Sequence, residues 1–327
     1  MNKWKCIFSL SLAIVLMGCE EETVVEQVEA PVVEAKQEAT EKPQKPQKPQ
    51  QEIEQEPVIV ELVDPSTSEV IHTIKPTELE FETDRVSYQQ TIEKLARNLA
   101  RGTEDAEGYD RRMVLDRLDD KGNVVKGSPL ILLRERVLVE RILAASVEGG
   151  KVELPIDIIE SDYDLEDVPY LDEVVVATYT TYFNPAETGR NKNIELSALA
   201  INNFIIGSGD YFSFNTVVGP RDEASGYQPA PEIVNKELVM GIGGGVCQTS
   251  STLFNAVDQL PVNYVERHHH SLDIGYVPKG RDATVSYGGL DFRFQNTSEV
   301  PFLIKTIYNK NSLTIEFRTS QKHSRAL

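Results

Sequence analysis

Apolar positions recur at helical spacing in several stretches of the chain. Residues 88–101 carry apolar side chains three or four positions apart, and Gly102 follows as a stop signal, so the pattern predicts an amphipathic helix. A second helix is predicted over about 134–146. A third is predicted to be capped by Asn193 and to end before Gly207.

Runs of β-branched and aromatic residues predict the strands. The longest run covers 174–182, and alternation over 152–156 predicts another strand. A turn at 120–123 between apolar residues predicts a hairpin. Further strands are predicted at 211–214, 217–218, 263–266, 284–287, 292–294, 301–308 and 312–317. The elements together predict an α+β fold: a small α+β domain, then a second α+β domain with a mostly antiparallel sheet and a cysteine-bearing helix.

The N-terminal residues resemble a bacterial lipoprotein signal. Lys3 and Lys5 precede an apolar run over 7–17, which is too short to span a bilayer as a helix. The run ends in LMGC, which resembles a lipobox, in which Cys19 is acylated once residues 1–18 are removed. A plain signal peptide or a short membrane anchor is the alternative. We expect an extracytoplasmic protein, held to the outer face of the bacterial cell membrane by the lipid on Cys19.

An acidic, proline-rich linker is predicted at 19–56. Residues 20–56 include eleven Glu and four Lys, and KPQ occurs three times in a row over 42–50. Such a segment cannot bury enough apolar surface to offset its ordering entropy, so it is predicted to be disordered and extended. The remaining chain is divided into domains at 57–165 and 166–327. The net charge of −19 for the whole chain argues against nucleic acid as a partner.

Cys247 is the candidate nucleophile. Of the three cysteines, Cys6 would be lost with the signal and Cys19 would carry the lipid, which leaves Cys247 as the free thiol of the mature protein. It lies in GGGVCQTSST at 243–252, just before a predicted helix over 248–258. The unpaired N–H groups and the dipole at a helix N-terminus lower the pKa of a thiol there. The alternative is a buried structural cysteine in a tightly packed glycine turn.

A histidine triplet follows the cysteine helix at 267–271, with the letters RHHHS. In an extended segment His268 and His270 would share one face and His269 would point to the other. A thiol nucleophile needs an imidazole to take up its proton, and that imidazole needs an orienting partner. The alternative is that Cys247, His268 and His270 ligate zinc.

Three downstream residues are the nearest candidates for orienting partners. They are Arg281 and Asp282, which are adjacent, and Asp291. The first two are also candidates for contacts with substrate, and Arg281 would otherwise pair with Asp282 or Asp291.

Six motifs are spread over the stretch from about 174 to 318. They are TTYF at 180–183, GDYFSFN at 209–215, the stretch 243–256, ERHHHS at 266–271, GRDATV at 280–285 and LDF at 290–292. Through these motifs the stretch resembles a VanW domain, a family named after an accessory protein of glycopeptide-resistance clusters. The preceding residues are similar to a peptidoglycan-binding domain that commonly stands before VanW domains.

The resemblance implies an L,D-transpeptidase-like thiol acyltransferase that acts on peptidoglycan stem peptides through a cysteine thioester. Hydrolysis by a cysteine peptidase or amidase would use the same residues. The alternatives are a non-catalytic peptidoglycan- or glycopeptide-binding accessory protein associated with vancomycin-type resistance, and a zinc-dependent cell-wall hydrolase. We expect no cofactor. The implied roles are nucleophile for Cys247, base for His270 or else His268, partner for Asp291, oxyanion binding around Gly244, Gly245 and Gln248, and substrate binding for Arg281 and Asp282.

Overall fold

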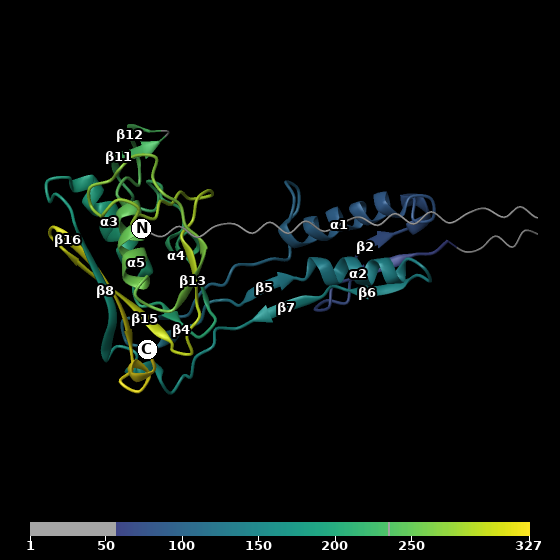
Figure 1. The fold of residues 1–327 in the computed structure, drawn as a ribbon, viewed down its shortest axis with the longest axis horizontal. Helices are drawn as coiled ribbons and strands as arrows, with labels where there is room; N and C mark the ends of the chain where they lie inside the picture. Colours follow the sequence, from purple (N-terminus) through teal and green to yellow (C-terminus); the bar gives the residue numbers. More distant parts are fainter. Residues whose placement is uncertain (1–56, 235) are drawn as a thin grey trace, which may run out of the picture. The chain divides into compact units, whose positions relative to one another are not determined.

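The computed structural model describes residues 57–234 and 236–327 (Figure 1). These residues belong to one unit, Gln55–Leu327. The predictions of a signal sequence, of lipid on Cys19 and of a linker lie outside the described residues.

The elements from β1 to β7 include a small α+β arrangement with its own hydrophobic core. Strand β1 pairs in parallel with β6 and antiparallel with β2, while β5 pairs antiparallel with β7. Helices α1 and α2 pack against each other, and their buried faces share a core with β1. The bounds are β1 (Val60–Val63), β2 (Val70–Ile74), η1 (Pro76–Leu79), α1 (Arg85–Arg101), β5 (Leu130–Leu133), α2 (Glu135–Ala145), β6 (Gly150–Glu153) and β7 (Ile156–Ile159).

Helix α1 begins three residues before its predicted start. Asp84 accepts hydrogen bonds from the backbone N–H groups of Val86 and Ser87, which caps the helix. The predicted apolar stripe is buried, with Tyr88 and Ile92 fully enclosed. The apolar stripe therefore predicted the helix correctly, and the Asp84 cap determines where the helix begins.

The predicted hairpin around 120–123 is confirmed as β3 (Arg117–Leu118) and β4 (Val124–Val125), which pair antiparallel. Met113, Leu115 and Leu130 lie on either side of it and belong to the core of the C-terminal elements. Some residues that come early in the chain are therefore packed into the core formed by the C-terminal elements.

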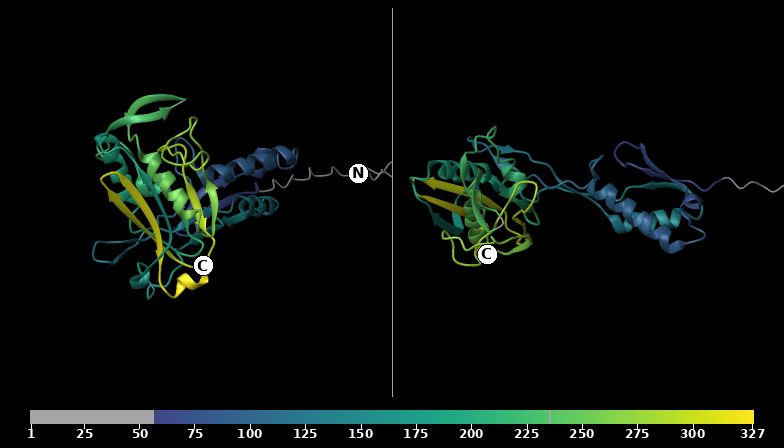
Figure 2. Two further views of the ribbon diagram at one scale, coloured as in Figure 1. Left: turned by 60° about the vertical axis from the view of Figure 1, so that its left-hand side comes forward. Right: turned by 90° about the horizontal axis from the view of Figure 1, so that it is seen from above.

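A four-stranded antiparallel sheet organises the rest of the chain, in the order β8-β16-β15-β9. Helix α5 packs on β8 and β16, and α3 packs on α5 and β15 (Figures 1 and 2). A three-stranded sheet, β10-β14-β13, and the hairpin β11-β12 complete this part. The bounds are η2 (Val168–Tyr170), β8 (Val174–Tyr182), α3 (Thr188–Ile201), β9 (Ile205–Ile206), β10 (Tyr211–Ser213), α4 (Phe214–Val218), β11 (Pro229–Val234), β12 (Glu237–Ile242), α5 (Val246–Val257), β13 (Val262–Glu266), β14 (Arg293–Asn296), β15 (Phe302–Asn309), β16 (Ser312–Thr319) and η3 (His323–Ala326).

The α+β prediction, with a mostly antiparallel sheet and a cysteine-bearing helix, is confirmed. Four local predictions are wrong. Asn193 lies buried inside α3 and does not cap it, residues 217–218 are helical in α4, and residues 284–287 form a single bridge through Thr284 and no strand. The strand expected over 152–156 is interrupted at Leu154 and Pro155, between β6 and β7. In the described residues no helix has the length and apolar character needed to cross a membrane.

Candidate functional site

The glycine triplet fixes the start of α5 and the position of Cys247. Gly243 and Gly245 have φ values of 99° and 108°, which L side chains rarely adopt. A Cβ atom on Gly244 would lie 2.5 Å from the carbonyl oxygen of Pro231, so this position needs glycine because the backbones approach so closely. Cys247 is then the second residue of α5, and its side chain is partly buried.

Polar side chains of α5 hold the segment that follows the histidines against the helix. The hydroxyl of Ser251 accepts a hydrogen bond from the backbone N–H of Ala283 at 2.9 Å, and the hydroxyl of Ser250 donates to the carbonyl of the same residue. The Sγ atom of Cys247 lies 3.5 Å from the carbonyl oxygen of Val285. The polar motif after the cysteine therefore brings residues 282–285 next to the thiol.

Asp282 and His270 form the second part of the site. The Nδ1 atom of His270 lies 2.7 Å from Oδ2 of Asp282, and the two side chains are only 7% and 9% exposed. His269 also contacts this carboxylate, with its Nδ1 atom 2.7 Å from Oδ1. Burial raises the pKa of Asp282, but the hydrogen bonds from His269 and His270 outweigh it and lower that pKa to about 2. Asp282 therefore stays ionised and orients the imidazole.

The thiol and the imidazole shift each other's ionisation. Burial alone would raise the pKa of Cys247, but the nearby His270 and its charge outweigh it, so the pKa is lowered. Burial alone would lower the pKa of His270, but the nearby Cys247 and its charge, together with Asp282, raise it. Both shifts favour a thiolate beside an imidazolium. Because Asp282 engages Nδ1, Nε2 is the ring nitrogen left for the thiol.

Cys247 and His270 open onto a cavity of about 800 Å³, within the usual size for small-ligand sites. Part of its wall comes from the hairpin β11-β12, through Ile233 and Leu238. Burial raises the pKa of Tyr276, another residue of the wall, so its hydroxyl stays protonated and able to donate. The cavity is thus large enough for a substrate that reaches the thiol.

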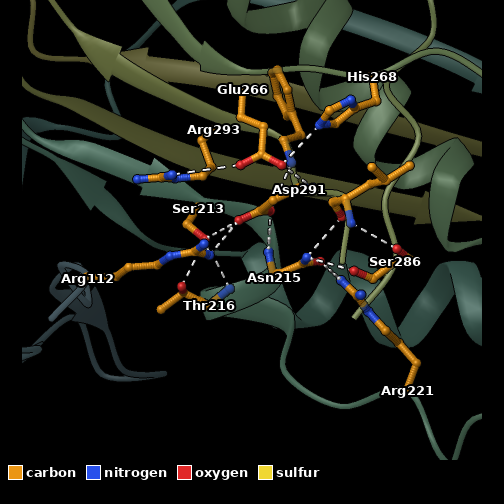
Figure 3. A network of polar contacts seen from close by, with 12 residues as sticks. Arg112, Ser213, Asn215, Thr216, Arg221, Glu266, His268, Ser286, Asp291 and Arg293 are labelled. Atoms are coloured by element: carbon orange, nitrogen blue, oxygen red, sulfur yellow. Dashed lines mark hydrogen bonds and ion pairs between the residues drawn. The ribbon is translucent and has the colours of Figure 1, made fainter. Parts of the chain in front are cut away.

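Arg221 is a partly buried cation in the wall of the same cavity, and nothing in the sequence points to it beyond its place after a Gly-Pro turn. Its Nη2 atom donates a hydrogen bond to Oδ1 of Asn215 at 2.8 Å (Figure 3). Its Nε and Nη1 atoms are buried and have no hydrogen-bond partner among the described residues. Burial lowers the pKa of Arg221, and an unpaired buried donor costs roughly 1–3 kcal/mol.

Asp291 does not orient the imidazole, contrary to the prediction. It is fully buried, and its Oδ2 atom accepts hydrogen bonds from Arg112 at 2.9 Å and from the hydroxyl of Ser213 at 2.6 Å. Its Oδ1 atom accepts from the backbone N–H of Asn215 at 2.9 Å (Figure 3). These contacts use both oxygens of the carboxylate, so Asp291 links β10 to α4 and does not reach His270.

His268 also lies apart from the thiol. Its Nε2 atom is 3.0 Å from Oε1 of Glu266, and its side chain is 39% exposed (Figure 3). Strand β13 ends at Glu266, so the alternation expected through the triplet does not continue, and His269 and His270 meet the same carboxylate. The predicted pairing of His268 with His270 on one face is therefore wrong.

The zinc set expected from Cys247, His268 and His270 is not brought together, because His268 faces Glu266. Among residues 57–234 and 236–327 no group of three or more His, Cys, Asp or Glu side chains is arranged to hold a metal ion.

Arg281 points away from the cavity. Its Nη1 atom lies 2.6 Å from Oδ2 of Asp258 and its Nε atom donates to Oδ1 of Asn255 at 2.8 Å, while the guanidinium lies over the ring of Phe254. Arg281 was expected to contact substrate or to pair with Asp282 or Asp291. It does not line the cavity beside Cys247, and its ion-pair partner is Asp258.

The predicted oxyanion residues divide into two groups. Gly244 and Gly245 line the cavity beside Cys247. Gln248 also lines it, but its backbone N–H donates to the carbonyl of Gly245 at 2.9 Å, and its side chain donates to Thr181 and to the carbonyl of Tyr182. The donors of Gln248 are therefore already used.

The fold and the site define an α+β protein in which a cysteine, a histidine and an aspartate meet at the N-terminal end of a buried helix. Residues 189–318 match the family model described as VanW like protein. The chain is 42% identical over 205 residues to a protein of Bacillus subtilis (strain 168) named "Uncharacterized protein YoaR", covering 62% of this chain and 68% of that one. The chain belongs to the VanW family.

A second relative is the "Vancomycin B-type resistance protein VanW" of Enterococcus faecalis (strain ATCC 700802 / V583). It is 31% identical over 117 residues, which cover 34% of this chain and 42% of the relative. No solved structure matches the chain.

The predicted family is confirmed, but the predicted function, a thiol acyltransferase acting on peptidoglycan stem peptides, is overturned. One relative is named as uncharacterised and the other as a resistance protein, and neither name nor the family description carries an acyltransferase activity. Arg281, which was to hold the stem-peptide carboxylate, is paired with Asp258.

Proposed function

We propose that the chain is a cysteine-dependent hydrolase of amide bonds. The observation that carries the proposal is the position of His270, whose Nδ1 atom binds Asp282 at 2.7 Å while the ring shifts the pKa of the Cys247 thiol downward. Water, and no second peptide, is the acyl acceptor in this proposal. The reaction is thus hydrolysis and differs from the transferase excluded above.

The proposed chemistry has two stages. The thiolate of Cys247 attacks the amide carbonyl carbon, a C–S bond forms, and the C–N bond breaks as His270 passes its Nε2 proton to the leaving amine. Neutral His270 then takes a proton from water, and the resulting hydroxide attacks the acyl carbon. The C–S bond breaks, which releases a carboxylic acid and returns Cys247 as a thiolate beside the protonated His270. Asp282 stabilises the imidazolium that forms in each cycle and keeps Nε2 directed at the reaction.

The surroundings of Cys247 support this assignment. The thiol lies in the first turn of α5, where backbone N–H groups and the helix dipole favour a thiolate. The protonated hydroxyl of Tyr276 is a donor in the same cavity and is a candidate for stabilising the developing oxyanion.

We also propose that the protein works outside the cytoplasm, held to the membrane by a lipid on Cys19. The charged residues, short apolar run and LMGC letters at the N-terminus support this location. An envelope location would expose the cavity to amide-containing cell-wall peptides, including peptidoglycan stem peptides. The Enterococcus faecalis relative is named as a vancomycin resistance protein, and we extend an association with such resistance to this chain as part of the proposal.

The hydrolase proposal is tested by incubating the full chain with a complex peptide mixture in ¹⁸O-labelled water and analysing the products by mass spectrometry. We expect new C-termini that carry ¹⁸O, absent with Cys247→Ala and reduced at least about a hundredfold with His270→Ala. His269→Ala is the matched control, because His269 touches Asp282 but does not line the cavity with Cys247. Cleavage that survives Cys247→Ala, or no labelled product from the wild-type chain, would refute the proposal.

A further inference from the structure

We propose that the guanidinium of Arg221 binds a carboxylate of the substrate beside Cys247. The substrate class is then an amide with a free carboxylate close to the bond that is cleaved, as at the C-terminal end of a peptide. This specificity rests on the proposed hydrolase function for its reaction, whereas the binding of an anion beside the thiol stands on the cavity itself.

The guanidinium of Arg221, a residue of the cavity wall, has nitrogen atoms from which no group of the described residues accepts a hydrogen bond. Only Nη2 has a partner, Oδ1 of Asn215 at 2.8 Å, while Nε and Nη1 are buried and unpartnered among the described residues. Arginine is fully charged in proteins, and its N–H groups match the oxygens of a carboxylate. The arrangement is therefore that of a cation held ready for an anion.

The charges around Arg221 support the same conclusion. No Asp or Glu side chain of residues 57–234 and 236–327 lies within ion-pair distance of its guanidinium, whereas Arg190 in the same cavity wall lies 3.7 Å from Glu187. The neighbours of the Arg221 guanidinium include the rings of Phe214 and Tyr287, with centroids 5.5 Å and 5.8 Å away. Its positive charge also acts on the thiol of Cys247. The buried carboxylate of Asp291 also acts on this charge, but it contacts Asn215 and Arg112 instead of Arg221. Arg221 is thus a positive charge close to the thiol that no described carboxylate contacts directly.

Asn215, which accepts the hydrogen bond from Arg221, is itself held by three hydrogen bonds (Figure 3). The Nδ2 atom of Asn215 donates hydrogen bonds to the carbonyls of Ser286 and Leu290, at 2.9 Å and 3.0 Å, and its backbone N–H donates to Asp291. These bonds orient Oδ1 of Asn215 toward the guanidinium. Asn215 and Asp291 are accordingly positioning residues for the arginine, which gives Asp291 a place in the site different from the one predicted.

Two alkylating reagents of nearly equal size test the proposal on the full chain. Iodoacetate carries a carboxylate and iodoacetamide is neutral, and their rates are followed on the peptide that contains Cys247. Both reagents need the thiolate, so the ratio of the two rates cancels changes in the pKa of the thiol. We expect Arg221→Gln to lower the iodoacetate-to-iodoacetamide ratio about tenfold, and Arg221→Lys to keep most of it, because an opposite charge near the thiol steers and holds the anion.

Arg190→Gln is the matched control, because it removes the same charge from the same wall where the charge is already paired with Glu187. We expect its ratio to stay within about twofold of the wild type. N-acetylalanine should also slow iodoacetamide in the wild type more strongly than N-acetylalaninamide does, and this difference should vanish in Arg221→Gln. Such a difference needs direct contact, since a long-range field would be screened by 0.5 M salt, at which the test is repeated.

An unchanged ratio in Arg221→Gln, or equal protection by the two acetylated compounds in the wild type, would overturn the carboxylate site. The far-UV circular dichroism spectrum and urea midpoint of each variant report whether it is still folded. Failure of the hydrolase proposal shows up separately, as absence of ¹⁸O-labelled products while the rate ratio still depends on Arg221.

Discussion

One carboxylate oxygen of Asp282 holds both the ring and the backbone of His270. Its Oδ2 atom lies 2.7 Å from the imidazole Nδ1 atom and also 2.7 Å from the backbone nitrogen of His270. The segment after β13 is irregular, so no strand pairing fixes the ring at that position. The aspartate therefore sets the orientation that strand geometry does not supply.

Replacing Asp282 by Asn should consequently reduce the rate of amide hydrolysis by roughly 10²–10⁴-fold, because the imidazolium loses its charged partner and the ring its fixed tautomer. The pKa of His270 should fall, since Asp282 is one of the causes that raise it. Product formation at several pH values measures the first effect, and the NMR titration of the His270 ring measures the second. A variant with wild-type turnover would exclude an orienting role for this carboxylate.

The pH dependence of thiol alkylation follows from the two shifted groups. The pKa of Cys247 is lowered, so its thiolate persists below the pH at which an ordinary thiol is protonated, and alkylation by iodoacetamide should continue into mildly acidic solution. In His270→Gln the cause of that shift is removed and burial remains, so the profile should move to higher pH. Because the pKa of Asp282 is about 2, its protonation cannot produce the acidic limb between pH 4 and 7. A profile that is the same in both proteins would contradict the thiolate–imidazolium pair.

Sequence patterns predicted those features that depend on residues close together in the chain. The glycine triplet gave Cys247 its place at the start of α5, and the apolar stripes gave α1 and the main strands. Strand alternation failed at the histidines because β13 ends at Glu266, one residue before the motif. Periodicity carries no information once a strand has ended.

The remaining site residues depend on contacts between segments far apart in the chain. Asp282 was one of three orienting candidates in the sequence, and no local pattern selected it from the other two. It reaches His270 because Ser250 and Ser251 tether Ala283, the next residue, to α5. Arg221 reaches the cavity because Asn215 holds it, and Asn215 depends in turn on Asp291, 76 residues later. Such couplings are visible only once the chain is folded.

The backbone turn before Cys247 should be intolerant of side chains. In Gly245→Ala the residue would have to adopt a φ of 108°, and its Cβ atom would lie 2.9 Å from the carbonyl oxygen of Arg190. We expect a loss of about 2 kcal/mol or more in the free energy of unfolding, measured by urea denaturation, together with slower alkylation of Cys247. Gly275→Ala is the control, because its Cβ atom would meet nothing within 4 Å and its φ lies outside the left-handed range. Equal stabilities for the two variants would show that the turn relaxes.

Asp291→Asn should lower the stability of the protein without changing the pKa of His270. The carboxylate is 1% exposed and accepts hydrogen bonds from Ser213, from the backbone N–H groups of Asn215 and Phe292, and from the half-exposed Arg112. Losing the charge should lower the free energy of unfolding by roughly 1–3 kcal/mol, with the exposed arginine contributing little of it. The pKa of His270 should stay where it is, unlike in Asp282→Asn, because Asp291 does not touch the ring. Denaturant titration measures the change in the free energy of unfolding, and NMR titration measures the pKa of His270. A fall in that pKa equal to the one in Asp282→Asn would restore Asp291 as an orienting partner.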